Sequence, residues 1–242
     1  MVETIQNLEP FADILHRAAE RKGGEEIVLE MAGESLSSEL IAQVPDDRWL
    51  SAFTKQVFQS GFVWRVVEQK WPGFEDVFFG FDIEKMLMMP DEMWEQKSSD
   101  PRIIRNGKKV MTIKENARMI YEISSEHGSF GKWVANWPKS DLINLWAYLK
   151  KHGARLGGNT GPYALRRLGV DTFLVSGDNE AYFRGYKLID GGISSKKTQS
   201  TIQQCFNQWH QETQLDYITL SRVLSFSVGD NWAGLESAAQ ND

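Results

Sequence analysis

The sequence is poor in cysteine, with Cys205 as the single one among 242 residues. One cysteine excludes an internal disulfide and a metal site built from several thiolates, and it is typical of a reducing compartment. The first residues lack the basic and apolar segments of a secretory signal, and no run of about 18 apolar residues occurs that would span a membrane. We therefore expect a cytoplasmic protein with no membrane partner.

Basic residues, 27 in number, are fewer than the 33 acidic ones, and they are unevenly spread. The formal net charge is −6 and the sequence pI is about 5.4, which by itself disfavours nucleic acid as a partner. Local patches nevertheless bind phosphate whatever the total charge. One basic cluster lies within residues 102–118, and a second surrounds a glycine-rich segment and comprises Lys150, Lys151, Arg155, Arg166 and Arg167.

Strand-like alternation of apolar and polar residues is missing, and apolar residues recur with a helical period instead. Helical patterns cover residues 11–18, 46–70, 103–123, 142–149 and 202–224. The sequence therefore predicts an all-α protein. We expect one domain over residues 1–242, built of two helical lobes with a cleft between them, with both termini in one lobe, acting as a monomer.

Glycine and proline predict where these helices stop. Gly61 is expected to interrupt the helix over 46–70, because glycine is unfavourable inside a helix. The sequence WPGF at 71–74 predicts a turn, and residues 127–133 predict a loop. Three methionines, Met86, Met89 and Met93, are expected to fill gaps in the core. A short helix is predicted from Tyr163 to Leu168.

The stretch LGGNTGPYA, residues 156–164, follows one helical pattern and precedes another. A glycine-rich turn at a helix N-terminus can present several backbone N–H groups to an anion, and the helix dipole favours negative charge there. We expect a helix-hairpin-helix over about 141–169 that holds a DNA phosphate. The residues expected to bind the DNA backbone are Gly157, Gly158, Asn159, Thr160, Gly161, Lys150 and Lys151. The same glycines also suit a tight helix–helix loop that binds nothing.

A single carboxylate, Asp178, follows the last glycine of that stretch by 17 residues. A carboxylate beyond a DNA-gripping hairpin suits cleavage of an N-glycosidic bond, because the sugar becomes oxocarbenium-like as the base departs. Asp178 is therefore the candidate catalytic residue. The alternative is structural, since the sequence SGDNEAYF can begin a helix with Asp178 as its N-cap.

Three segments of the sequence resemble known enzymes. Residues 158–178, GNTGPYALRRLGVDTFLVSGD, resemble the hairpin-to-aspartate segment of the helix-hairpin-helix DNA glycosylase superfamily. Residues 58–86, FQSGFVWRVVEQKWPGFEDVFFGFDIEKM, and 102–118, RIIRNGKKVMTIKENAR, resemble 3-methyladenine DNA glycosylase I. The resemblance covers about residues 46–180. It implies an all-helical enzyme that excises N3-methyladenine from alkylated double-stranded DNA.

The resemblance also implies roles for particular residues. Trp64 matches the tryptophan that stacks on the flipped base, and an indole face attracts a cationic base. Gly61 and Phe62 match the residues that fill the gap left in the duplex, and Gln59 lies beside them at the rim of the base pocket. Ordinary core packing is the alternative for Trp64 and for Phe62.

Three features depart from that family. Gln56 stands where the family has a glutamate that recognises the methylated base, and an amide carries no charge to favour a cation. The zinc motif of better-studied members is missing, and the histidines and Cys205 have no ligand spacing, so no zinc and no other cofactor is expected. The superfamily resemblance leaves open a monovalent cation held by main-chain carbonyls of the hairpin. The histidines are His16, His127, His152 and His210. Asp178 is present, although this family usually lacks the superfamily aspartate.

Taken together, these patterns predict a DNA glycosylase for alkylated purine, with Gln56, Gln59 and Trp64 forming the base pocket. Two alternatives stay open. One is a non-catalytic protein that binds lesions or DNA structure, and the other is a glycosylase for a different damaged base, because the missing charge at Gln56 weakens the argument for a cationic ligand.

Overall fold

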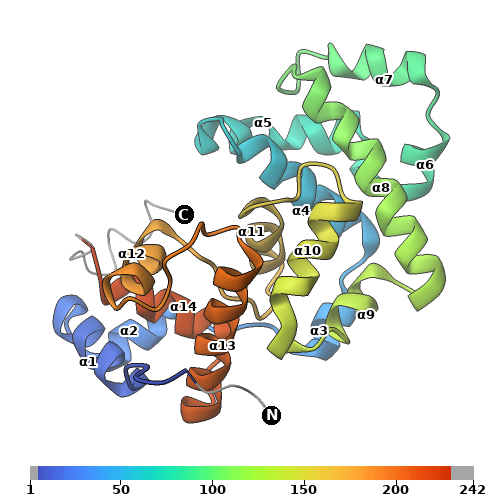
Figure 1. Cartoon of the computed structure of the whole chain (residues 1–242). Helices are drawn as coiled ribbons and strands as arrows, with labels where there is room; N and C mark the ends of the chain where they lie inside the picture. Colours follow the sequence, from blue (N-terminus) through green and yellow to red (C-terminus); the bar gives the residue numbers. More distant parts are fainter. Residues whose placement is uncertain (1–4, 230–242) are drawn as a thin grey trace. The chain divides into compact units, whose positions relative to one another are not determined.

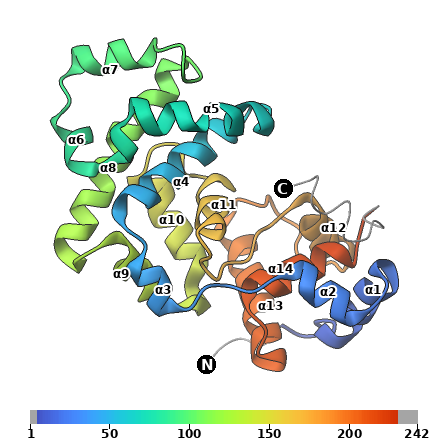
Figure 2. The ribbon, with the colours of Figure 1, turned by 180° about the vertical axis from the view of Figure 1, so that it is seen from behind.

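A computed structural model describes residues 5–229, which form helices and connecting segments with no β-strand in that range. This confirms the all-α prediction. Figures 1 and 2 show the helices from two opposite sides. They are α1 (Phe11–Lys22), α2 (Glu25–Ala32), α3 (Ser38–Gln43), α4 (Asp46–Gln59), α5 (Trp64–Val77), η1 (Phe79–Phe81), α6 (Ile83–Met88), α7 (Asp91–Ser98), α8 (Gly107–His127), α9 (Phe130–Ala135), η2 (Lys139–Asp141), α10 (Leu142–His152), α11 (Thr160–Arg167), α12 (Gly177–Gly185), α13 (Lys196–Thr213) and α14 (Tyr217–Phe226).

The chain divides into two compact units. Among the described residues, the first unit contains 5–35, 139–143 and 171–229, and the second contains 36–138 and 144–170. Helices α1, α2, α12, α13 and α14 belong to the first unit, as their grouping in Figure 2 shows. Residues 5–35 and 171–229 thus fall in the same unit.

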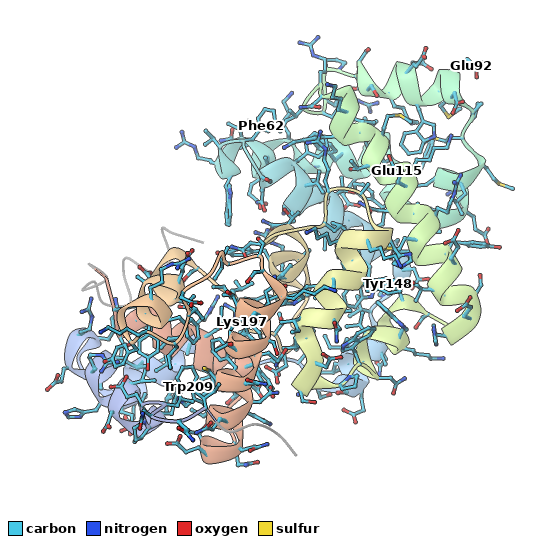
Figure 3. All side chains as sticks on the ribbon, in the orientation of Figure 1. Phe62, Glu92, Glu115, Tyr148, Lys197 and Trp209 are labelled. Carbon is cyan, nitrogen blue, oxygen red and sulfur yellow. The ribbon has the colours of Figure 1, made fainter. Side chains whose placement is uncertain are left out.

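Aromatic side chains make up much of the first unit's core. Trp209 of α13, labelled in Figure 3, is fully buried against Phe11, Phe183 and Phe206. Its indole N–H donates to the backbone oxygen of Glu9 at 2.9 Å. The predicted helical face that includes Phe206 and Trp209 is therefore confirmed, and it ties the start of the chain to α13.

Helix α8 lies at the centre of the second unit, where it packs against α4, α6, α7 and α9. The face predicted from its sequence is fully buried, and consists of Val110, Ile113, Ala117 and Ile120. A buried stripe of this kind supplies most of the stability of a helix, because tertiary packing outweighs intrinsic propensity. Three polar side chains of α8 are also buried: Lys109, Thr112 and Asn116.

The predicted interruption at Gly61 is confirmed, because α4 ends at Gln59 and α5 begins at Trp64. Gly61 has φ of +84°, a left-handed conformation that favours glycine. The turn predicted at 71–74 is wrong, since α5 continues through Pro72. The rings of Trp71 and Phe74 stack at 5.0 Å and keep the helix intact, so packing overrides the local signal.

Three smaller expectations also need correction. The loop predicted over 127–133 contains the start of α9, which Ser129 caps by accepting from the backbone N–H of Lys132. Helix α11 begins at Thr160, three residues earlier than predicted. Met93 is partly exposed, whereas Met86 and Met89 are buried as expected.

We expect Gly73→Ala to destabilise the protein by about 1–3 kcal/mol, because overpacking a tight contact costs that much. A Cβ on Gly73 would overlap the carbonyl oxygen of Arg102. Gly107→Ala is the matched control, since a Cβ there meets nothing within 4 Å and removing a helical glycine stabilises by less than about 1 kcal/mol. Urea denaturation of both variants measures the effect, and equal midpoints would contradict it.

Candidate functional site

The α4–α5 connection projects apolar side chains from the second unit. Phe62 is 38% exposed and Val63 is 66% exposed, and Figure 3 shows Phe62 at the edge of the molecule beside this connection. A Cβ on Gly61 would meet no atom within 4 Å, so the backbone there is open to an approaching ligand. Core packing is therefore wrong as an explanation of Phe62.

Trp64 opens α5 and is only partly buried. Tyr163 of α11 meets its ring edge-on, with centroids 6.3 Å apart and planes at 85°. The guanidinium of Arg167 lies 5.9 Å from the ring centroid, within reach of a cation–π contact. Helix α11 also packs against α4. The second helix of the predicted hairpin thus frames Trp64, which is not a core residue.

Glu68 connects the three helices around Trp64. It lies one turn after Trp64 on α5 and accepts from Gln59 Nε2 of α4 at 2.9 Å and from Arg167 Nη1 of α11 at 3.2 Å. Lys55 Nζ of α4 lies 2.5 Å from its second oxygen. Burial tends to raise the pKa of Glu68, but the hydrogen bonds and charges of Lys55 and Arg167 prevail and lower it. Glu68 is therefore ionised at neutral pH.

Two glutamine side chains of α4 are buried beside this network. Gln56 is 5% exposed and Gln59 is 2% exposed, and the Oε1 atoms of both make no hydrogen bond within residues 5–229. Because the ionised Glu68 can only accept hydrogen bonds, the Nε2 of Gln59 faces Glu68. The Oε1 of Gln59 therefore points away from Glu68. A buried acceptor without a donor costs about 1–3 kcal/mol, which a ligand N–H would recover.

The glycine-rich stretch forms the α10–α11 connection. Gly158 has φ of +61°, and a Cβ on Gly161 would lie 2.7 Å from the Leu156 carbonyl oxygen, so this tight path requires glycine at both positions. The backbone N–H groups at the start of α11 are already used, since Thr160 donates to the Gly157 oxygen at 3.3 Å and Gly161 to the Leu156 oxygen at 3.2 Å, and Pro162 has none. Lys150 and Lys151 are exposed at the end of α10. The positive charge of these two lysines is therefore what this connection can offer to an anion.

The sequence matches a known protein family. Residues 42–164, half of the sequence, match the family model described as methyladenine glycosylase. The protein belongs to the methyladenine glycosylase family. The matched region includes α4, α5, α8, α10 and the start of α11, and thus every residue of the predicted base pocket.

Several solved structures of such glycosylases are similar to this family member. A 3-methyladenine DNA glycosylase I is 23% identical over 52% of this chain and 80% of its own, with a TM-score of 0.45. The enzyme from Staphylococcus aureus, in a study of 3-methyladenine recognition, is 23% identical over 52% of this chain and 77% of its own, with a TM-score of 0.46. No curated protein matches the chain.

Asp178 lies outside the matched region and in the first unit, whereas the other candidate residues lie in the second. It is the second residue of α12 and is partly buried. The N-cap of α12 is Ser176, whose Oγ accepts from the backbone N–H of Asn179 at 3.2 Å. The interpretation of Asp178 as that cap is therefore wrong. Its Oδ2 accepts from Ser225 Oγ at 3.0 Å.

The structure adds residues to which the sequence pattern had assigned no role. Glu68, Tyr163 and Arg167 surround Trp64, and only their tertiary contacts reveal them. Lys109 and Asn116 belong to the segment RNGKKVMTIKENAR, which carries the family resemblance. That resemblance was the signal in the sequence that could have pointed to them. Asn106 caps α8 by accepting from the backbone N–H of Lys109.

Within residues 5–229, no group of three or more His, Cys, Asp or Glu residues is placed to hold a metal ion. None of the helices described here combines the length and apolar character required to cross a membrane.

We expect Glu68→Gln to lower the melting temperature at pH 7 by about 1–4 °C, as loss of a small ion-pair network does. Because the pKa of Glu68 is lower in the folded protein than in the unfolded chain, its ion pairs stabilise the fold at higher pH. This stabilisation is complete above the unfolded pKa of about 4.3 and is lost as pH falls through the lower folded pKa. The difference in melting temperature between wild type and variant should therefore narrow steadily as pH falls below that unfolded value. Glu115→Gln, at an exposed position on α8, is the control. A difference that does not narrow on acidification would contradict the ion-pair account.

Proposed function

We propose that this protein is a DNA glycosylase that flips an alkylated purine, N3-methyladenine, out of double-stranded DNA and hydrolyses its N-glycosidic bond. The observation that carries the proposal is a pair of buried, unpartnered carboxamide oxygens on α4 near a partly exposed tryptophan, within the region that matches methyladenine glycosylases. Enzymes that act on a base extrude it and hold it by stacking and by hydrogen bonds to its edge.

Hydrogen-bond complementarity supports an adenine-type ligand. The Oε1 atoms of Gln56 and Gln59 are acceptors without a donor, and the exocyclic amine of adenine is a donor. A base with a carbonyl in that place would leave acceptor facing acceptor, which costs free energy. In this proposal Trp64 stacks on the flipped base. The guanidinium of Arg167 near the Trp64 ring reduces the attraction of that ring for a cationic base. Recognition then rests on shape and hydrogen bonds more than on charge.

Exposed groups of the second unit support DNA binding in the same proposal. Phe62 projects from the α4–α5 connection as a side chain suited to fill the place of the extruded base. Lys150 and Lys151, exposed at the end of α10, supply positive charge for a phosphate beside the glycine-rich α10–α11 connection.

Asp178 is proposed to stabilise the sugar as the glycosidic bond breaks. The bonding electrons leave with the base, positive charge develops at C1′, and water adds there and loses a proton. N3-methyladenine carries a positive charge in DNA and departs as a neutral base, so protonation of the leaving group is not required. The Oδ1 atom of Asp178 makes no hydrogen bond within the described range, whereas Oδ2 is held by Ser225.

Base release from methylated DNA tests the proposal directly. We expect the purified protein to release N3-methyladenine from dimethyl-sulfate-treated duplex DNA, identified by chromatography of the soluble bases, and to leave abasic sites. Release of a different modified base would correct the substrate. Retention of tight, lesion-dependent binding without release of any base would favour the non-catalytic alternative.

A carboxylate that stabilises the developing sugar cation should be needed for release but not for binding. We expect Asp178→Asn to slow single-turnover base release by at least about 100-fold, and to change the DNA dissociation constant by less than about threefold. Asp190→Asn, at an exposed position of the same unit, should behave as wild type. Unchanged release by Asp178→Asn would remove this residue from the mechanism.

A further inference from the structure

Lys109 is an unusual residue to bury. It is 5% exposed and lies in the first turn of α8, where the helix dipole disfavours a cation. It forms no ion pair within the part of the chain that the structure describes. Burial, and secondarily the charge of Arg155, lower its pKa below the ordinary value. A methionine would fill the same space without these costs, so the ammonium group itself must contribute something.

What the ammonium contributes is a set of contacts with the α4–α5 connection. Lys109 Nζ donates to the Phe58 backbone oxygen at 3.2 Å and to the Ser60 backbone oxygen at 2.5 Å. These carbonyls lie at the end of α4, where helices leave acceptors without an intrahelical partner. The same nitrogen lies 4.7 Å from the centroid of the Phe62 ring. Lys109 therefore holds both the backbone and the projecting ring of the connection.

The ring of Phe62 lies on an exposed connection. It is 38% exposed, and Gly61 before it makes the backbone adaptable. A cation–π contact at a partly desolvated site contributes about 0.5–2 kcal/mol, which is enough to select one conformation of a surface loop. Without Lys109, the α4 carbonyls lose their donor and the ring loses its cation.

We infer that Lys109 is a positioning residue that holds Phe62 ready to enter the duplex when the base is extruded. The expected effect of Lys109 on base release rests on the proposed function. Its expected effect on the α4–α5 connection rests only on contacts within the second unit. Preorganisation of this kind lowers the entropy that must be lost when the complex forms. Its benefit should appear only where a paired base has to be displaced.

Asn116 provides the matched comparison, because it lies two helical turns further along α8. It is fully buried, its Oδ1 accepts from the backbone N–H of Ala154 at 2.7 Å, and its Nδ2 donates to the Ala154 oxygen at 3.2 Å. Asn116 thus holds the segment that leads into the glycine-rich α10–α11 connection. Lys109 and Asn116 thus act on two different connections.

The test compares Lys109→Met with wild type on two substrates that carry the same lesion, one in a fully paired duplex and one in an unpaired loop. We expect single-turnover release by Lys109→Met to fall at least about tenfold on the duplex and less than about threefold in the loop. Lys132→Met, at an exposed lysine of the same unit, should match wild type on both. An equal loss on both substrates, or no loss on either, would overturn the inference.

Hydrogen exchange separates this inference from the proposed function, because it needs no DNA. In Lys109→Met we expect the amides of residues 60–63 to exchange at least about tenfold faster than in wild type, and those of residues 153–157 to be unchanged. In Asn116→Ala we expect faster exchange at 153–157 and unchanged exchange at 60–63. If wild type releases no base, the proposed function fails and exchange alone decides the role of Lys109. Unchanged exchange at 60–63 would overturn that role. If Lys109→Met does not fold, Lys109→Gln takes its place in both measurements with the same expected outcomes.

Discussion

The candidate site depends on one ionised carboxylate. Glu68 accepts from Gln59 of α4 and from Arg167 of α11, and it pairs with Lys55, so three helices meet at a single side chain of α5. Because a carboxylate accepts but does not donate, it determines which end of the Gln59 amide faces it. The orientation of the unpartnered Gln59 oxygen and the place of Arg167 beside Trp64 both follow from this one charge.

A base-binding site without a negative charge of its own would recognise its ligand differently from one built on a glutamate. At Gln56 and Gln59 the free groups are neutral amide oxygens, so the free energy of recognition comes from pairing a donor with each acceptor. The carboxylate nearby, Glu68, is already neutralised by Lys55 and Arg167. In the proposed function, selection therefore acts on the pattern of donors and acceptors along the edge of the base.

Local sequence patterns predicted much of the fold, and their failures have physical causes. The buried face of α8 and the interruption at Gly61 were predicted correctly, because periodicity and glycine act within a few residues. The turn at 71–74 was not, since stacking of Trp71 and Phe74 and the contact of Gly73 with Arg102 keep α5 helical through Pro72. Arg102 lies outside the window that a local pattern examines, and a turn signal does not take ring stacking into account.

By itself, the sequence determined the helical class, the family resemblance and the candidate residues Gln56, Gln59, Phe62 and Trp64, because each is a matter of residue type and spacing. Only the tertiary structure decided that Ser176 caps α12 instead of Asp178, that Phe62 faces solvent, and that Glu68, Arg167 and Lys109 surround the α4–α5 connection. The contacts of Lys109 with Phe58 and of Arg167 with Glu68 join residues 51 and 99 positions apart. No spacing rule along the chain encodes such contacts, since they arise only when helices pack.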